Sequence, residues 1–374
     1  MVEVKGYTAT SVMKRSIDYV LNEGFERKVY GGTIPKDIKD PDSPNDFDRI
    51  MIEAEPGMTM VLNNPLARWT DYSDHWIGIT LREQEDHLQG FNPGYVIKYS
   101  KLYPVWLNSY KYFNYTYGER LQHYPYNPVE KSGRDFFRNM NINVLNINQI
   151  ERIVEMLKSH PTTRKACIST WYPPSDIGDP YCPCNMVFQV RVVDGKLDWI
   201  TVVRSLDVLR GFSENLFMFT IWQEYVAKLL DMPLGKYTTI ALNAHLYQDQ
   251  IEDGYHKQNV PDCYDFYNPR PAFKEDFPAF QMKFIDDSLF GLGEKSFESA
   301  YKLARKLPDY WRNWKLALIS EWERLQGRNE NAMEAFVKID NEFQLSVAKR
   351  LKRKMPKCLN ALPWKDQKEF LKGG

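Results

Sequence analysis

The chain has five cysteines, and one pair of them beside a proline is the first feature of the sequence that could do chemistry. Five cysteines are few and odd in number for 374 residues, which argues against a disulfide framework and leaves room for a reactive thiol. Cys182 and Cys184 flank Pro183, and such a pair can supply two zinc ligands. No second Cys or His pair with ligand spacing follows, so we expect no metal site. Taken alone, Cys184 is typical of a small buried apolar residue.

Three further motifs share one register with this cysteine pair. In chain order the set is Thr163-Arg164-Lys165, then Tyr181-Cys182-Pro183-Cys184-Asn185 followed by Gln189, then Arg204-Ser205-Leu206-Asp207 followed by Gly211 and Asn215, and last Asn243-Ala244-His245-Leu246-Tyr247. With these motifs the chain resembles the thymidylate synthase family, which has Pro-Cys-His, Arg-Ser-x-Asp and Asp-x-His-x-Tyr at the same spacings. Several motifs in one register are much harder to produce by chance than any one of them.

The resemblance implies a transferase that moves a one-carbon unit from 5,10-methylenetetrahydrofolate to C5 of dUMP. C5 of uracil is a poor nucleophile, so a thiolate must first add to C6. Cys184 would be this thiolate, and Arg204 would lower its pKa and bind the substrate phosphate together with Ser205. The Asn215 amide would pair with the N3–H and O4 edge of the base, which favours dUMP over dCMP.

The resemblance assigns the remaining motif residues to binding. His245 and Tyr247 would hold the deoxyribose hydroxyl, and Gln189 would also contact the nucleotide. Asp207 would face the folate. Two basic residues, Arg164 and Lys165, would complete the phosphate site of a partner subunit, so the resemblance also implies a homodimer.

Two family roles lie upstream, where the register is looser. Glu83 begins the segment Glu83-Gln84-Glu85-Asp86-His87-Leu88-Gln89-Gly90, which resembles the family's Glu-Leu-Leu-Trp-x-Leu-x-Gly without its hydrophobic interior, and Glu85 competes for the same proton-relay role. Tyr117, followed by Gly118, resembles the Tyr-Gly that helps to remove the C5 proton. Either Arg27 or Arg68 could supply the family's first phosphate arginine, and the sequence leaves this choice open.

Two departures from the synthase pattern bear on the product. The synthase has an Ile-Trp-x-x-Trp segment where this chain has Val96-Ile97-Lys98-Tyr99-Ser100. In addition, residues 248–374 form a long extension beyond the Asn243–Tyr247 motif. Both departures favour the phage-type deoxyuridylate hydroxymethyltransferases, which let water reach the transferred carbon and give 5-hydroxymethyl-dUMP. The alternatives are reductive methylation to dTMP by a thymidylate synthase, and a catalytically idle relative that binds nucleotides or nucleic acid.

The elements that must position these residues have an α+β pattern. Residues 10–21 and 148–160 have apolar positions at helical spacing, with Gly24 as a helix stop after the first. Asp194-Gly195 between two β-rich runs predicts a hairpin over residues 186–204, followed by a helix over 214–230 and a strand over 237–243. Beyond residue 296 the pattern is helical, with a stripe of packing residues at Trp311, Trp314, Leu318, Trp322 and Leu325.

We therefore expect a thymidylate synthase-like fold, with a mixed or antiparallel sheet covered by helices. Its catalytic domain would span residues 1–290, with a loop-rich part over 1–130, and a C-terminal helical extension would span 291–374. Lys plus Arg and Asp plus Glu both number 49, so the zero net charge gives no general attraction to nucleic acid or membranes. The sequence shows neither an apolar run of about 18 residues nor a signal peptide at its start, so we expect a cytoplasmic protein.

Overall fold

A six-stranded mixed sheet forms the centre of the described part of the protein. The computed structural model describes residues 1–30, 48–70, 72, 77–89, 115–124, 147–179, 182–257, 260, 268–273 and 297–352. The sheet contains, in spatial order, β1 (Val2–Gly6), β4 (Met58–Leu62), β9 (Leu234–Ala241), β7 (Lys196–Val203), β6 (Asn185–Val193) and β5 (Cys167–Ser169). β1 runs parallel to β4 and β9 parallel to β7, whereas the other neighbours are antiparallel. The expected mixed sheet is confirmed.

The hairpin of β6 and β7 sets the position of the cysteine pair. Asp194 and Gly195 have φ values of 50° and 71°, and two positive values are what a tight hairpin turn of this twist requires. At the other end of the hairpin, Asn185 is the partner of Val203, and the Arg204 amide donates to the Cys184 carbonyl at 2.9 Å. The antiparallel pairing therefore brings two motifs together that are 20 residues apart in the printed numbering.

A second sheet brings the remaining motifs side by side. It contains β2 (Phe25–Tyr30), β3 (Asp48–Ala54), β10 (Ala244–Tyr247) and β8 (Leu206–Asp207) in that order. β10 pairs antiparallel with β3 and parallel with β8, where His245 is the partner of Asp207. The Asn243–Tyr247 motif thus lies between the Arg204–Asp207 motif on one side and strand β3 on the other.

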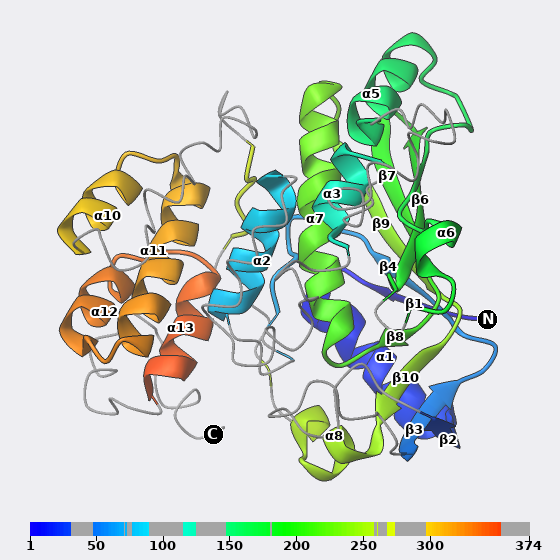
Figure 1. Cartoon of the computed structure of the whole chain (residues 1–374), viewed down its shortest axis with the longest axis horizontal. Coiled ribbons are helices and arrows are strands. Elements are labelled where there is room, and N and C mark those ends of the chain that lie inside the picture. Colours follow the sequence, from blue (N-terminus) through cyan, green and yellow to red (C-terminus); the bar gives the residue numbers. More distant parts are fainter. Residues whose placement is uncertain are drawn as a thin grey trace, which may run out of the picture.

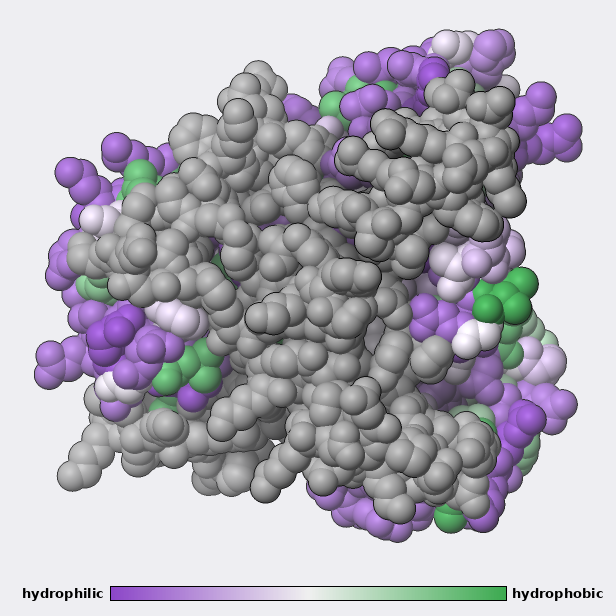
Figure 2. Space-filling model, in the orientation of Figure 1, coloured by the Kyte–Doolittle hydropathy of each residue, from purple (hydrophilic) through white to green (hydrophobic). Residues whose placement is uncertain are grey.

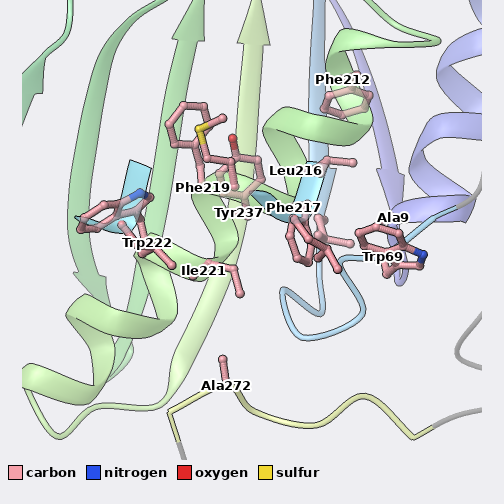
Figure 3. Packing of buried hydrophobic residues seen from close by; sticks show 14 of the residues in the cluster. Ala9, Trp69, Phe212, Leu216, Phe217, Phe219, Ile221, Trp222, Tyr237 and Ala272 are labelled. Atoms are coloured by element: carbon pink, nitrogen blue, oxygen red, sulfur yellow. The ribbon is translucent and has the colours of Figure 1, made fainter. Parts of the chain in front are cut away.

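Two long helices pack against the sheets and form part of the core. α1 (Ala9–Glu23) begins with a capping box at Thr8 and Ser11 and ends at Gly24, as the sequence predicts. α7 (Gly211–Leu229) is buried almost all round because the six-stranded sheet covers one side and aromatic residues cover the other. Figure 3 shows Phe219 of α7 beside Tyr237 of β9, and Phe217 beside Trp69 at a ring distance of 5.0 Å. The predicted helix is confirmed, and it begins three residues earlier than expected.

Shorter helices surround the edge of the site. α5 (Gln149–Ser159) is capped by Asn148 and confirms the helix expected over 148–160, and α6 (Pro173–Asp176) lies just before the cysteine pair in the chain. α2 (Ile77–Gln89) and α3 (Tyr117–Gln122) pack against each other and carry the upstream motifs. α8 (Gln248–Glu252) and the short 3₁₀ helix η3 (Tyr255–Lys257) follow β10.

The C-terminal helices gather at the side of the molecule away from the six-stranded sheet (Figure 1). They are α10 (Phe297–Ala304), α11 (Asp309–Leu325), α12 (Asn329–Phe336) and α13 (Phe343–Lys352). Trp311 and Trp314 of the predicted stripe are buried, and Trp314 packs on Phe217 of α7 at 5.4 Å. α11 also contacts α2, so α2 is held between the C-terminal helices and the rest of the core.

The described surface has no continuous apolar area on the face shown in Figure 2. Hydrophilic residues predominate there, and hydrophobic ones form small separate patches. Within the described ranges, no helix has the length and hydropathy needed to cross a membrane.

Candidate active site

The Tyr117 hydroxyl holds the turn that carries Cys184. Its oxygen accepts hydrogen bonds from the backbone amides of Cys184 at 3.2 Å and Asn185 at 3.1 Å. The side-chain amide of Asn185 donates to the same oxygen at 2.8 Å. Burial raises the pKa of Tyr117 to about 12, and the nearby Cys184 adds to this shift, so the phenol stays protonated at neutral pH. The tyrosine and the cysteine, 67 residues apart, therefore form one unit.

Asn185 links this unit to the start of α7. Its Nδ2 also donates to Oδ1 of Asn215 at 3.3 Å, and both side chains are buried. Because the Asn215 oxygen faces Asn185, the amide group of Asn215 keeps its N–H donors for another partner. The residue expected to read the base thus lies beside the expected nucleophile.

Arg204 lies beside both cysteines, but it fixes the backbone as well as supplying charge. Its Nε donates to the Pro183 carbonyl at 3.0 Å and its Nη2 to the Cys182 carbonyl at 3.1 Å. We expected Arg204 to lower the pKa of the Cys184 thiol. The pKa is instead raised, because burial outweighs the lowering by Arg204 and the nearby Cys182 raises it further. In the protein without substrate, the thiol form of Cys184 is favoured.

Asn243 organises the residues expected at the sugar. Its Oδ1 accepts from Ser205 Oγ at 3.3 Å and faces His245 Nδ1 at 2.6 Å. An amide oxygen only accepts, so Nδ1 of His245 carries the hydrogen and Nε2 has a lone pair. Burial lowers the pKa of His245, which keeps the ring neutral, and Nε2 is buried with no hydrogen-bond partner among the described residues. His245 is therefore an acceptor ready for a hydroxyl group.

Arg49 of β3 contacts the candidate site, which the sequence did not predict. Its guanidinium lies over the ring of Tyr247, 3.5 Å from the centroid, and it forms an ion pair with Asp249 at 2.6 Å. Tyr247 in turn packs edge-on against His245 at 4.8 Å. The only sequence signal was its alternation in a β-rich segment, because the contact depends on the pairing of β3 with β10.

The two arginines considered for the phosphate have other partners. Arg68 is fully buried and paired with Glu224 of α7, beneath Tyr310 of the C-terminal helices. This environment argues against Arg68 as a phosphate ligand. Arg27 of β2 is exposed and pairs with Glu53 at 3.2 Å.

Asp207 and Gln189 already make internal hydrogen bonds. One oxygen of Asp207 accepts from the amides of Leu209 and Arg210, and the other accepts from Gln250 at 2.6 Å. Gln189 lies half-buried on β6 and donates to the carbonyl of Arg164 at 3.2 Å. Two neighbouring basic residues, Arg164 and Lys165, are exposed in the segment before β5.

The structure separates the two candidate glutamates of α2. Glu85 is fully buried and pairs with Arg82 at 2.9 Å and with Lys315 of α11. Glu83 is partly exposed, and its Oε1 lies 3.6 Å from His87 Nε2. Since His87 packs against the Tyr117 ring at 5.8 Å, Glu83 lies on the side of α2 that faces the cysteine. The interior of this motif is charged because Glu85 faces Lys315 of the C-terminal helices.

Some expectations fall outside the described residues. These are Tyr181, the segment Val96–Ser100 and Gly90. Within the described residues, no group of three or more His, Cys, Asp or Glu could hold a metal ion.

The arrangement defines an α+β protein that holds a partly buried thiol among a phenol, carboxamides, a guanidinium and an imidazole. A family model described as thymidylate synthase matches residues 79–262, the region that contains all of these groups except Arg49. The matched region, residues 79–262, is a thymidylate synthase-family region.

Individual relatives agree with this assignment. The chain is 32% identical over 144 residues to a "Putative thymidylate synthase" of Methanosarcina barkeri, a match that covers 38% of this chain and 58% of the relative. It is 33% identical over 156 residues to one of Methanocaldococcus jannaschii, covering 40% and 63%. A "Thymidylate synthase" of Listeria monocytogenes is 30% identical over 106 residues, covering 28% and 34%. The chain thus spans less than two thirds of the length of these relatives.

Proposed function

We propose that the protein transfers a one-carbon unit from 5,10-methylenetetrahydrofolate to C5 of dUMP, with Cys184 as the nucleophile. The observation that carries this proposal is the hydrogen-bonded unit of Cys184, Tyr117, Asn185 and Asn215. It combines a thiol with donors for a carbonyl oxygen of a base, and its residues stand in the register of the family motifs. These are the groups that addition to a uracil ring requires.

In the proposed reaction, the Cys184 sulfur adds to C6, and negative charge develops on O4. The Asn215 N–H donors, oriented by Asn185, would stabilise this charge without having to reorganise. C5 would then attack the methylene carbon of the folate. After loss of the C5 proton, the bond between this carbon and the folate nitrogen would break and tetrahydrofolate would be released. Water would add to the methylene carbon, or hydride from tetrahydrofolate in the methylation alternative, and the Cys184 thiolate would then leave C6. Tyr117 stays protonated and would orient the water or base that takes the proton. Glu83 would relay protons to O4 of the base and to the departing nitrogen of the folate.

The remaining residues would bind the nucleotide and the folate. Arg204 and Ser205 would hold the phosphate, and Arg49 supplies a further cation at the Tyr247 side of the site. The free Nε2 lone pair of His245 would accept the deoxyribose hydroxyl. Asp207 would face the folate after giving up one of its internal hydrogen bonds.

A homodimer is part of this proposal. Opposite α7, the six-stranded sheet has a face of half-buried, mostly β-branched residues, namely Val187, Ile200, Val202, Thr238 and Ile240. Arg164 lies at this face, since its carbonyl is bonded to Gln189 of β6. A second subunit packed on the sheet would place Arg164 and Lys165 near its phosphate site.

We further propose that the product is 5-hydroxymethyl-dUMP and that residues 291–374 form an extension of a catalytic domain over 1–290. The absence of the Trp-containing segment from the sequence at 96–100 supports entry of water to the transferred carbon. Reductive methylation to dTMP is the second candidate, and the names of the relatives from Methanosarcina barkeri and Listeria monocytogenes favour it.

One incubation separates these reactions. The purified protein is mixed with dUMP and 5,10-methylenetetrahydrofolate, the nucleotide is analysed by mass spectrometry, and dihydrofolate is followed by absorbance. Hydroxymethylation gives a hydroxymethyl product and tetrahydrofolate, whereas methylation gives dTMP with one dihydrofolate per turnover. Turnover of dCMP but not dUMP would contradict the role of Asn215, and no turnover of either would contradict the proposed function.

A further inference from the structure

His87 is a buried histidine that the family motif does not predict. It lies on α2 one turn after Glu83, is only 4% exposed, and occupies a position at which the family motif specifies no residue type. In the cysteine motif, by contrast, Asn185 stands where the family has histidine. Tyr117 therefore contacts a carboxamide in the cysteine motif and an imidazole on α2.

The hydrogen bonds of His87 determine which nitrogen carries its proton. The backbone amide of Gly118 donates to Nδ1 at 3.2 Å, so Nδ1 has a lone pair. In the neutral ring the hydrogen is then on Nε2, which has no hydrogen-bond partner among the described residues and lies 3.6 Å from Glu83 Oε1. A small rotation of either side chain closes this contact into a hydrogen bond to the carboxylate.

The packing of α3 fixes the ring in this position. A Cβ atom at Gly118 would lie 2.0 Å from the His87 carbonyl oxygen, so only glycine permits this approach of the two helices. The same imidazole packs against the Tyr117 ring at 5.8 Å. His87 thus contacts two of the residues to which we assign proton transfers.

We propose that His87 is the positioning residue for Glu83: its Nε2–H holds the carboxylate toward Tyr117 and the bound nucleotide. This inference rests on the proposed function. The other two carboxylates of the motif, Glu85 and Asp86, do not compete for this task, because they are paired with Arg82. The motif lacks the apolar residues that would restrain Glu83 by packing. The Nε2–H group of His87, which lies on the same face of α2, supplies this restraint instead.

Three variants test the inference. His87→Phe removes the donor at similar volume, His87→Gln keeps an N–H near the position of Nε2, and His160→Phe at the exposed end of α5 is the matched control. We expect His87→Phe to lower kcat about 10- to 100-fold, the usual effect of losing a hydrogen bond to a charged group. The KM for dUMP should change less than about twofold, and His87→Gln should recover most of kcat, because only an oriented donor is needed.

The outcomes distinguish this inference from the proposed function. A wild-type protein that turns over dUMP while His87→Phe matches its kcat would overturn the inference alone. So would a His87→Gln variant that binds dUMP and melts like wild type but is as slow as His87→Phe. Absence of turnover in the wild type would contradict the proposed function. In that protein, ¹⁵N spectra still test the geometry: a ring protonated on Nδ1, or resonances unaffected by Glu83→Gln, would overturn the inference.

Discussion

Replacement of Lys315 by methionine should destabilise the protein through α2. Lys315 of α11 is 1% exposed and pairs with the fully buried Glu85, and this contact joins the C-terminal helices to the helix that carries Glu83. Methionine has similar length and no charge. After this substitution, Glu85 keeps its ion pair with Arg82 among the described residues.

The magnitude follows from two opposing effects. Removing one partner of a buried ion pair costs about 3–5 kcal/mol because the other charge loses its compensation. Burial lowers the pKa of Lys315 to about 8 although Glu85 opposes this, so desolvation already offsets part of the attraction. Glu85 also keeps Arg82. We therefore expect Lys315→Met to lower the free energy of unfolding by about 2–3 kcal/mol.

Urea unfolding followed by circular dichroism measures this difference. Lys302→Met on the exposed side of α10 is the control and should change the free energy of unfolding by less than about 0.5 kcal/mol. The double variant Glu85→Leu/Lys315→Met should recover most of the loss, since no charge is then buried alone. A Lys315→Met protein as stable as wild type, or a double variant no better than the single one, would refute the reasoning.

Three further predictions concern other parts of the molecule. Tyr117→Phe leaves three donors at Cys184 and Asn185 without their acceptor, so thermal unfolding should show a loss of about 1–3 kcal/mol, with kcat reduced at least tenfold; an unchanged kcat would contradict its role. Burial raises the pKa of Glu342 to about 7, so the folded state binds more protons than the unfolded state between pH 4.5 and 7 and stability falls as pH rises through this window. Glu342→Gln should therefore be about 2–3 kcal/mol more stable than wild type at pH 8 and gain little at pH 4.5, as urea titrations at the two pH values would show; equal gains at both would refute the assignment. Mixing inactive Cys184→Ser with inactive Arg164→Ala protein should restore about a quarter of the wild-type sites, because half of the subunits enter mixed dimers with one intact site each; no recovery after subunit exchange would argue against shared sites.

Local sequence signals were sufficient for most of the elements. Asp194-Gly195 has the backbone that its turn requires, and Asn148 and Gly24 mark helix ends where expected. These signals act within a few residues, so they can be read from the chain directly. The family motifs gave the fold class, since they fix the order of strands and helices around the cysteine.

Long-range contacts explain what the sequence did not show. Arg49 reaches Tyr247 only through the pairing of β3 with β10. The buried ion pair of Glu85 depends on Lys315, which is 230 residues away from it. The raised pKa of Cys184 results from burial, which charge patterns in the sequence do not report.

Release of tritium from [5-³H]dUMP tests the central claim that Cys184 activates C5 for one-carbon transfer. The label leaves C5 only if the ring has been activated by addition at C6, whichever product forms afterwards. With 5,10-methylenetetrahydrofolate present, we expect release into water by wild type and by the matched variant Cys182→Ser, within about fivefold of each other, and at least about a thousandfold less by Cys184→Ser. Release by Cys184→Ser at the wild-type rate would contradict the claim.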